Sequence, residues 1–485
     1  MDILTAWELG ASQITAVEVN PLIVSAADDI YHRRRVRVVL ESDRSYLRRS
    51  KEAFDIILLS LSSSYHPVRS GAYSLAEDYR YTLEAFQDLL ARLKPDGLLV
   101  VTRWLQTPPS ESLRTFALGI SALEASGLPP AECLVAYRSY NTATLLVKNG
   151  HFTPPELQEI REFTESRAYD LIYAPDINPQ EVNQHNILPE PEYYQTFTAL
   201  LNSQPRQNYY STYPFNVSPP TDDHPFFGHF FKWSQAKQVW AELGKTWQPF
   251  GGAGYFVILA LLLIATLLAI ILVLLPAAAS LFHHSPSNLQ GITKVSPTVP
   301  YLLYFAWIGF AFLLVEIPLI QRFILYLGHP AYAMTAVLFT ILLFSGLGSY
   351  FGKSMPLVYA LGFLVAILFV APMLLPVIFN LSLGLALGYR LCITLLLLAP
   401  IGFLMGIPFP SGIGWLLAEN DRSHLIPWVW GVNGATSVVS AVLAALLALS
   451  FGFGWVLRIG ALCYAGAMFT ILITGWRAPA SRPRR

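Results

Sequence analysis

The feature that most constrains this chain is an uncharged apolar run from Tyr255 to Leu275, "YFVILALLLIATLLAIILVLL". A helix needs about 20 apolar residues to cross the hydrocarbon core of a bilayer, and a helix of a soluble protein is rarely apolar on every side. Similar runs follow, and the spans are expected near 254–279, 301–325, 331–351, 356–379, 388–407, 427–450 and 455–475. Residues 251–478 are therefore predicted to form a transmembrane bundle of about seven helices, with the lipid bilayer as its partner and a basic tail at 479–485.

The first half of the chain has shorter apolar stretches and a mixed composition. Strand-like stretches at 14–17, 36–40, 54–61 and 98–104 alternate with helix-like segments, including a long amphipathic one at 76–93. Strands that alternate with helices predict crossover units and a mostly parallel sheet, and "CLVAYRSYNTATLLVKN" indicates a late hairpin. We therefore predict an α/β domain at 1–150 and a loop-rich extension at 151–250 that contains "PPTDDHPFF".

Composition excludes some classes of function. The chain has 32 basic and 32 acidic residues, so nothing indicates a nucleic-acid partner. Its cysteines, Cys133, Cys392 and Cys463, are scattered through the chain. Neither a disulfide framework nor a metal site is expected from such spacing.

The order of motifs in the first half resembles the spermidine synthase family. "ITAVEVNP", "RSYLRRSKEAFDIILLSL" and "SGAYSLAEDYRYTLEAFQDLLARLKPDGLLVVTRW" are most similar to its membrane-bound relatives, and "SPPTDDHPFF", "EIPLIQRFILYLGHPAYA", "GFLMGIPFPSGI" and "PWVWGVNGATSVVSAVLA" extend the resemblance over nearly the whole chain. The resemblance implies a Rossmann-like methyltransferase domain fused to transmembrane helices. It also implies S-adenosylmethionine or its decarboxylated form as a ligand.

The resemblance places the adenosyl ligand at the ends of strands. Glu18, after a strand, matches the acid expected to hold the ribose hydroxyls, the alternative being a solvated turn residue. Asp43 in "ESDR" is a candidate for the adenine contact or a turn residue, and Arg44 either pairs bidentately with a carboxylate or is a solvated surface arginine. The expected ligand contacts are Glu18, Asn20, Glu41, Asp43, Arg44 and Ser60.

One departure from the family concerns the catalytic loop. Where the family is expected to place an aspartate that accepts the proton of the attacking amine, this chain has Ser60, Ser62, Ser63 and Ser64. Serine is no base for an alkylammonium proton without a partner, which argues against standard aminopropyl transfer. The candidate catalytic residues are Ser62, His66 and Glu77, although His66 could be an ordinary loop histidine and Glu77 an acid that favours a first helical turn. A polyamine or another small amine is expected to contact Tyr73, Asp78, Asp222 and Asp223.

A second departure concerns the first strand. In this family a strand and a glycine-rich turn that cradle the methionine portion of the ligand are expected just before a segment like "DILTAWELGA", and here that segment starts at Asp2. Three explanations stay open: the chain is a fragment, which we favour; a separate polypeptide supplies the strand; or the site is degenerate. A sheet that lacks this strand would leave unpaired backbone groups along both of its neighbours.

Polar residues inside the apolar runs suggest a function by default. Glu316 and Arg322 lie in one run and Asn433 in another. They could form structural hydrogen bonds that lock the bundle, or line a path or pocket for a cationic or lipid-like substrate. Glu316 is expected to interact with Asn433 or with Arg322.

The combined expectation is a membrane-bound spermidine synthase-like transferase that transfers an aminopropyl group to a polyamine. The alternatives are an S-adenosylmethionine-dependent methyltransferase, and a membrane transporter or sensor with a degenerate adenosyl-binding domain. The cytosolic cofactor places the soluble domain on the cytoplasmic side, and the basic tail should lie there too. Seven spans would separate them, so "GIPFPSGIGWLL" could add a crossing. A homo-oligomer is a further open alternative.

Overall fold

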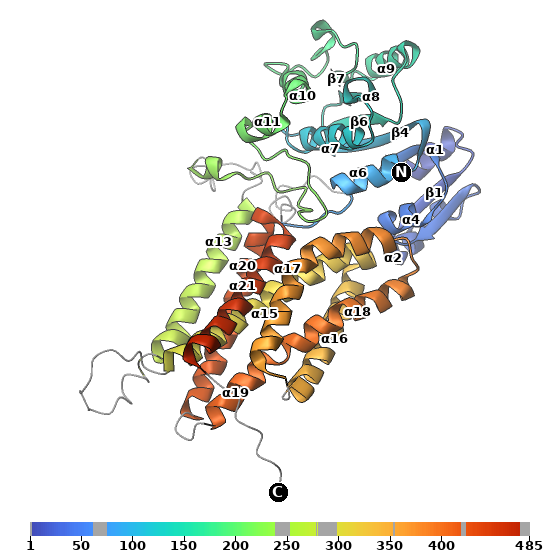
Figure 1. Ribbon diagram of the computed structural model, residues 1–485. Helices are drawn as coiled ribbons and strands as arrows, with labels where there is room; N and C mark the ends of the chain where they lie inside the picture. Colours follow the sequence, from blue (N-terminus) through green and yellow to red (C-terminus); the bar gives the residue numbers. More distant parts are fainter. Residues whose placement is uncertain are drawn as a thin grey trace. The chain divides into compact units, whose positions relative to one another are not determined.

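The computed structural model describes residues 2–61, 75–237, 253–277, 279, 298–352, 355–418 and 423–475. The chain divides into two compact units, Met1–Phe256 and Val257–Arg485 (Figure 1). The first unit contains α1 (Asp2–Glu8), β1 (Ile14–Glu18), α2 (Pro21–Ala26), α3 (Asp28–Tyr31), β2 (Val36–Leu40), α4 (Asp43–Arg49), β3 (Phe54–Leu59), α6 (Leu83–Leu90), β4 (Leu93–Trp104), α7 (Glu111–Ala125), α8 (Pro130–Cys133), β5 (Leu134–Arg138), β6 (Thr142–Lys148), α9 (Pro154–Ser166), β7 (Asp170–Tyr173), η1 (Pro179–Glu181), α10 (Glu192–Asn202), α11 (Arg206–Thr212) and η2 (Trp233–Gln235).

The strands of the first unit form two sheets. β1 and β2 pair in parallel, and the second sheet has the order β3-β4-β6-β5-β7. Only β3 and β4 are parallel within the larger sheet, since β6, β5 and β7 join it by antiparallel pairing. The hairpin expected in 133–149 is thereby confirmed as β5 and β6, whereas the mostly parallel sheet is corrected to a mixed one. Among the described residues, β1 pairs only with β2 and β3 only with β4, so each keeps one unpaired edge.

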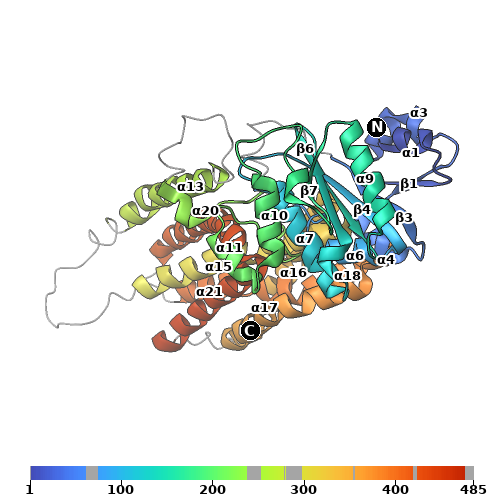
Figure 2. The same cartoon turned by 90° about the horizontal axis from the view of Figure 1, so that it is seen from above.

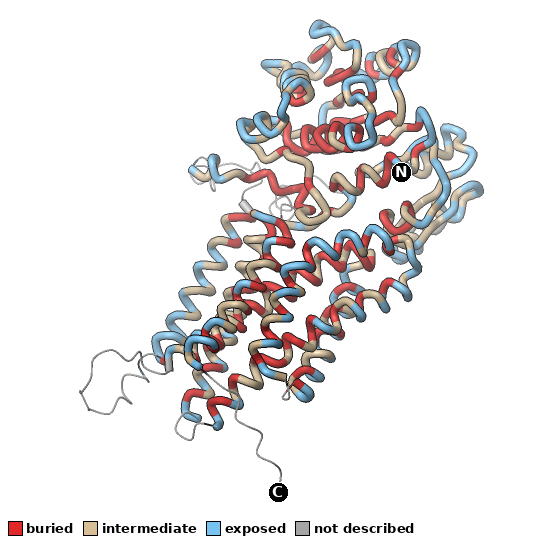
Figure 3. Tube along the Cα trace, viewed as in Figure 1, coloured by how far each residue is buried: buried red, intermediate tan, exposed pale blue. Residues whose placement is uncertain are grey.

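Successive residues of a strand point to opposite faces, and β5 shows that the larger sheet has a core on each side. Leu134 and Ala136 belong to the main core, which α6, α7 and α10 cover. Val135 and Tyr137 face a smaller core that includes Leu157 of α9. The sheet therefore lies between α9 and the layer of α6, α7 and α10 (Figure 2). α7 is the long buried helix of this unit (Figure 3).

The long helix expected at 76–93 is shorter in the structure. α6 begins after Thr82, whose hydroxyl accepts a hydrogen bond from the Ala85 backbone N–H at 3.2 Å. The preceding residues make backbone bonds elsewhere, because Asp78 N donates to Pro225 O (2.8 Å) and Leu83 N donates to Pro220 O (2.9 Å). Residues 75–82 therefore form a turn that contacts the "PPTDDHPFF" segment.

The second unit is helical. Its elements, together with the helix that crosses from the first unit, are α13 (Ala253–Ala269), a π-helical stretch η3 (Ile270–Leu274), α15 (Thr298–Leu327), α16 (Pro330–Phe351), α17 (Leu357–Ser382), α18 (Leu387–Met405), α19 (Pro408–Ala418), η5 (Ser423–Leu425), α20 (Ile426–Phe451) and α21 (Phe453–Thr474). Seven helices of the described chain are long and apolar enough to cross a membrane. The multi-pass membrane character is thus supported, whereas the side on which the soluble unit lies stays a prediction.

"GIPFPSGIGWLL" does not form an independent crossing in this arrangement. α19 has 11 residues, and at about 1.5 Å per residue it is roughly 17 Å long, short of the ~30 Å core of a bilayer. α18 and α19 together make one candidate span, Leu387–Ala418.

Small residues allow the helices of the second unit to approach closely. α15 packs against α20 and α21, and α16 packs against α18. A Cβ atom on Gly406 would lie 2.0 Å from the carbonyl oxygen of Ser345, so the backbones of α18 and α16 touch there. Such contacts between small residues are a common source of helix association in membranes.

Candidate functional site

The candidate site lies at the carboxyl ends of β1 and β2, where open α/β sheets bind ligands. Glu18 ends β1 and is level with Leu40, the last residue of β2. Its Oε1 accepts hydrogen bonds from the backbone N–H groups of Val19 (2.9 Å) and Asn20 (3.0 Å), which fixes the carboxylate over the strand end. Asn20 Oδ1 accepts from Leu22 N at 3.0 Å and caps α2. Both residues were predicted to contact the ligand. Glu18 lies at the strand end, whereas the Asn20 side chain is used to cap α2.

Asp43 opens α4 immediately after β2. Its Oδ1 accepts from the Arg44 backbone N–H at 2.7 Å, and burial raises the pKa of its carboxyl, partly offset by that hydrogen bond and by the charges of Arg44 and Arg80. Asp78 also acts on the pKa of Asp43 and raises it. The loop after β2 and the turn before α6 therefore meet. Glu41, in contrast, forms an ion pair with Arg49.

Residues 75–82 bring further charged groups to the same place. Arg80 donates to Asp78 through Nε (2.9 Å) and Nη2 (2.8 Å), a bidentate pair. Glu77 forms no ion pair in the part of the chain that the structure describes, and burial raises the pKa of its carboxyl. A desolvated carboxylate with a raised pKa is a stronger proton acceptor than an exposed one. Glu77 is the candidate base of the described site.

Arg44 lies in a buried ionic network. Its Nε donates to Asp88 Oδ2 at 2.8 Å, and Nη1 and Nη2 donate to the two oxygens of Asp222 at 3.0 and 3.1 Å. Thr82 Oγ1 donates to Asp222 Oδ1 at 2.7 Å, and Glu84 Oε2 accepts from Asp222 N at 2.9 Å. Burial alone would lower the pKa of Arg44, but the carboxylates of Asp222 and Asp88 raise it.

This network settles one sequence-based alternative. Arg44 is no solvated surface residue, because it pairs bidentately with a carboxylate. That carboxylate is Asp222, so neither group is left for a ligand. Asp223, beside it, is half-buried. Ser60 is exposed directly after β3.

Several predicted residues cannot be placed. Ser62, Ser63, Ser64, His66 and Tyr73 lie outside the described residues.

Sequence reasoning missed Asp88, the second partner of Arg44. Asp88 shares the buried face of α6 with Ala85 and Leu89, at the i, i+3, i+4 spacing of one helix face. A charged residue among the apolar positions of an amphipathic helix indicates a buried partner, since an unpaired buried charge is costly. That signal was available in "LEAFQDLL".

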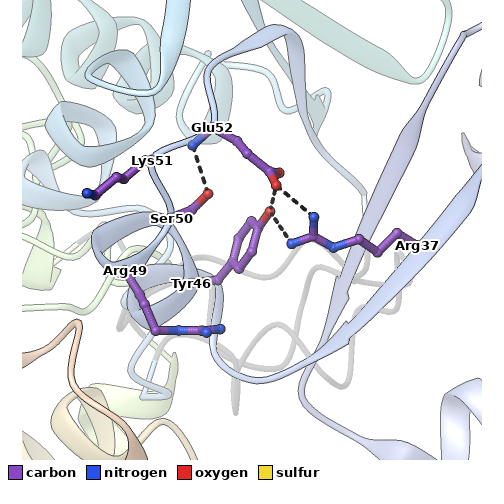
Figure 4. A pocket seen from close by; sticks show the side chains of 6 residues that line it. All are labelled: Arg37, Tyr46, Arg49, Ser50, Lys51 and Glu52. Carbon is purple, nitrogen blue, oxygen red and sulfur yellow. Dashed lines mark hydrogen bonds and ion pairs between the residues drawn. The ribbon is translucent and has the colours of Figure 1, made fainter.

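An open cavity of about 370 Å³ lies elsewhere in this unit, lined by Arg37, Tyr46, Arg49, Ser50, Lys51 and Glu52 (Figure 4). The Glu52 carboxylate accepts hydrogen bonds from Arg37 Nη1 (2.7 Å) and from the Tyr46 hydroxyl (3.0 Å), so the charges of Glu52 and Arg37 are paired with each other. The cavity is at the amino end of β2 and the last turn of α4, the opposite end from Glu18 and Asp43. Its position argues against a role in the candidate site.

The polar residues of the second unit serve partly to join helices. Asn433 Nδ2 of α20 donates to the carbonyl oxygen of Phe305 in α15 at 3.0 Å. Ser437 Oγ donates to Gly309 O at 3.1 Å between the same helices. Glu316 and Arg322 are both buried in α15. Asn433 therefore supports the structural alternative, bonding to backbone rather than to the expected Glu316.

No protein-family model and no curated protein matches this chain.

Proposed function

We propose that this chain is a membrane-bound, spermidine synthase-like transferase that uses S-adenosylmethionine or its decarboxylated form and transfers an aminopropyl group to a polyamine. The supporting observation is that Glu18 and Asp43 follow the carboxyl ends of two paired strands, and that Asp78, the chain neighbour of Glu77, lies near enough to act on the Asp43 carboxyl. Glu18 and Leu40 are in register, Asp43 follows closely, and the turn that carries Glu77 reaches Asp43 through Asp78. The proposed fold is the Rossmann-like methyltransferase domain. In that proposal, β1 and β2, which form a sheet of their own, belong to the same domain as the five-stranded sheet.

The residues present suit an adenosyl ligand at this place. The Glu18 carboxylate accepts hydrogen bonds, as a pair of ribose hydroxyls requires, and Asp43 offers a second acceptor. When bound, the ligand supplies an electrophilic carbon beside a sulfonium. The amine nitrogen bonds to that carbon as the C–S bond breaks and a neutral thioether leaves, and Glu77 accepts the proton that the amine gives up. Burial raises the pKa of the Glu77 carboxyl, which makes its carboxylate a stronger base.

The acceptor amine has different partners from those expected first. Asp222 is engaged by Arg44, so we assign it the role of holding the "PPTDDHPFF" segment against α4. Asp78 is likewise engaged by Arg80, so Asp223, half-buried beside Asp222, remains the proposed contact of a cationic amine. The segment that carries Asp223 contacts the turn that carries Glu77, since Asp78 N donates to Pro225 O at 2.8 Å.

The test uses the full chain in lipid nanodiscs. We expect decarboxylated S-adenosylmethionine to bind, and Glu18→Gln to weaken that binding at least about tenfold, equal to about 1.4 kcal/mol. Glu8→Gln, which changes an exposed acid of α1, is the matched control and should bind normally. Putrescine should then yield spermidine, and Glu77→Gln should abolish turnover while binding persists. Absence of adenosyl binding in the wild-type chain would refute the proposal, and a methylated product would favour the methyltransferase alternative.

A transporter or sensor is the second candidate, and Glu316 is the observation that favours it. This carboxyl is 7% exposed in the middle of a membrane helix, where an ionisable residue commonly marks a substrate or ion path. Labelled spermidine should then enter vesicles that contain the chain, and Glu316→Gln should stop the uptake. Uptake without any transferase product would place this candidate first.

A further inference from the structure

Aromatic rings gather where the first unit leads into its first apolar helix. Phe231 stacks on Tyr255 with ring centroids 5.1 Å apart and meets Phe256 edge-on at 5.3 Å. Trp233 contacts Phe231 at 5.6 Å and Tyr255 at 5.4 Å, and His229 lies 5.6 Å from Tyr255. We call His229, Phe231, Trp233, Tyr255 and Phe256 the aromatic cluster.

Tyr255 fixes the level of the cluster along α13. It lies in the first turn of a candidate span, Gly254–Ala277, that has 24 residues. Such a helix is about 36 Å long, longer than the ~30 Å hydrocarbon core. If the span is centred on the core, its first turn lies at the boundary with the headgroups, and the rings in contact with Tyr255 share that level along α13.

One ring of the cluster is turned outward. Trp233 is 61% exposed, whereas Tyr255 and Phe231 are 3% and 6% exposed. An indole at this depth has an apolar face for acyl chains and an N–H donor for lipid carbonyls and headgroups, which is why tryptophan is enriched at membrane interfaces.

The backbone that carries Trp233 is held from inside the unit. Lys232 Nζ donates to the carbonyl oxygens of Tyr210 and Tyr213 at the end of α11. Arg114 of α7 donates to the carbonyl oxygen of His229 at 2.9 Å. Trp233 is therefore a fixed projection of the soluble unit rather than the tip of a loose chain.

We propose that Trp233 inserts into the boundary between headgroups and acyl chains of a phospholipid bilayer, and that it forms the contact by which the soluble unit rests on the membrane. The aromatic cluster transmits this contact to α13. The proposal is independent of the transferase assignment, because it rests on exposure, depth and ring contacts alone.

The test places a fluorophore at the proposed contact. The full chain carries Cys392→Ser to remove the exposed cysteine, with Trp233→Cys labelled by bimane, in phosphatidylcholine nanodiscs that contain spin-labelled lipid. We expect at least twofold quenching by a headgroup-level spin label and weaker quenching by one at mid-chain. Tyr140→Cys, at a residue 81% exposed between β5 and β6, is the matched control and should not be quenched. Equal quenching at both positions, or none at 233, would overturn the proposal.

A second measurement keeps an aromatic ring in place. The emission of wild type minus that of Trp233→Phe isolates the indole at 233. This component should be quenched by brominated phosphatidylcholine and protected from aqueous iodide. Quenching by iodide together with insensitivity to the brominated lipid would also refute the proposed insertion.

Discussion

Removing the guanidinium of Arg44 should loosen the docking of the "PPTDDHPFF" segment on α4. The Arg44 side chain is 3% exposed, and its partners Asp88 and Asp222 are 8% and 21% exposed. At 3 Å and an effective dielectric constant near 20, each pair attracts with about 5 kcal/mol, most of which offsets the cost of desolvation. Removing one partner of a buried pair typically costs about 3–5 kcal/mol.

For Arg44→Met we expect a loss near the lower end, about 3 kcal/mol. Asp88 keeps its ion pair with Arg48 at 2.6 Å, and Asp222 keeps the hydroxyl of Thr82 at 2.7 Å. Asp88 and Asp222 would thus each keep one partner after the loss of Arg44. Adding Asp222→Asn should then cost little more, because one unpaired charge is removed, and the two changes should be non-additive by about 1–3 kcal/mol.

Amide hydrogen exchange of the full chain, read by mass spectrometry, measures this locally. A loss of 3 kcal/mol in the free energy of opening corresponds to roughly 100- to 200-fold faster exchange in peptides that cover α4 and 221–231. Arg37→Met is the matched control, since its ion pair with Glu52 is 46% and 45% exposed and exposed pairs contribute little to stability. If Arg44→Met exchanged no faster than Arg37→Met, or if the double change were additive, the reasoning would be wrong.

Three further predictions concern other contacts. Burial and the charge of Arg114 lower the pKa of His229 to about 3. Because the folded pKa lies below the unfolded value of ~6.5, the free energy of unfolding should fall as pH drops below ~6.5, by up to about 1.4 kcal/mol per pH unit. His229→Phe should remove this component, as thermal unfolding at pH 5 and 7 would reveal. Gly406→Ala, at the residue that caps α18, should lower the melting temperature by separating α16 from the end of α18, with a cost of about 1–3 kcal/mol. Gly388→Ala in the first turn of α18, where an added Cβ would meet no neighbouring element within 4 Å, should not. Lys232→Met should speed exchange in α11 by leaving the carbonyls of Tyr210 and Tyr213 without their charged donor, a loss of about 1.5–3 kcal/mol, whereas Lys237→Met, on an exposed residue, should not.

The membrane half is predictable from sequence because its signal is local. A run such as Tyr255–Leu275 is apolar along its whole length, and length and composition suffice to indicate a span. The β5-β6 hairpin is predictable for the same reason, since its two strands are neighbours in the chain. The strand order of the larger sheet is not, because pairing between β4 and β6 across α7 depends on packing that no short window contains.

The candidate site divides in the same way. Glu18 and Asp43 follow directly from their positions after strands. The role of Asp222 does not, because its partner Arg44 lies 178 residues earlier in the chain. From the sequence alone, the adjacent acids Asp222 and Asp223 between prolines favoured an amine ligand. Only the tertiary contact shows that the cation paired with Asp222 is the guanidinium of Arg44. The helix start at Leu83 was missed for a similar reason, since residues before it bond to Pro220 and Pro225.

Arg114 has a consequence for the order in which this protein forms during synthesis. Its guanidinium donates to the carbonyl oxygens of Asn216, Phe226, Phe227 and His229, up to 115 residues later in the chain. At about 5–20 residues per second, the ribosome needs roughly 6 to 23 s to make that stretch. Throughout this interval α7 carries a cation whose final partners do not exist, so water must solvate it and the helix cannot bury its face completely. The first unit therefore closes only after the chain has been made as far as His229, shortly before the first candidate span at Gly254–Ala277, and a chain stalled before His229 should present an open α7 to chaperones and proteases.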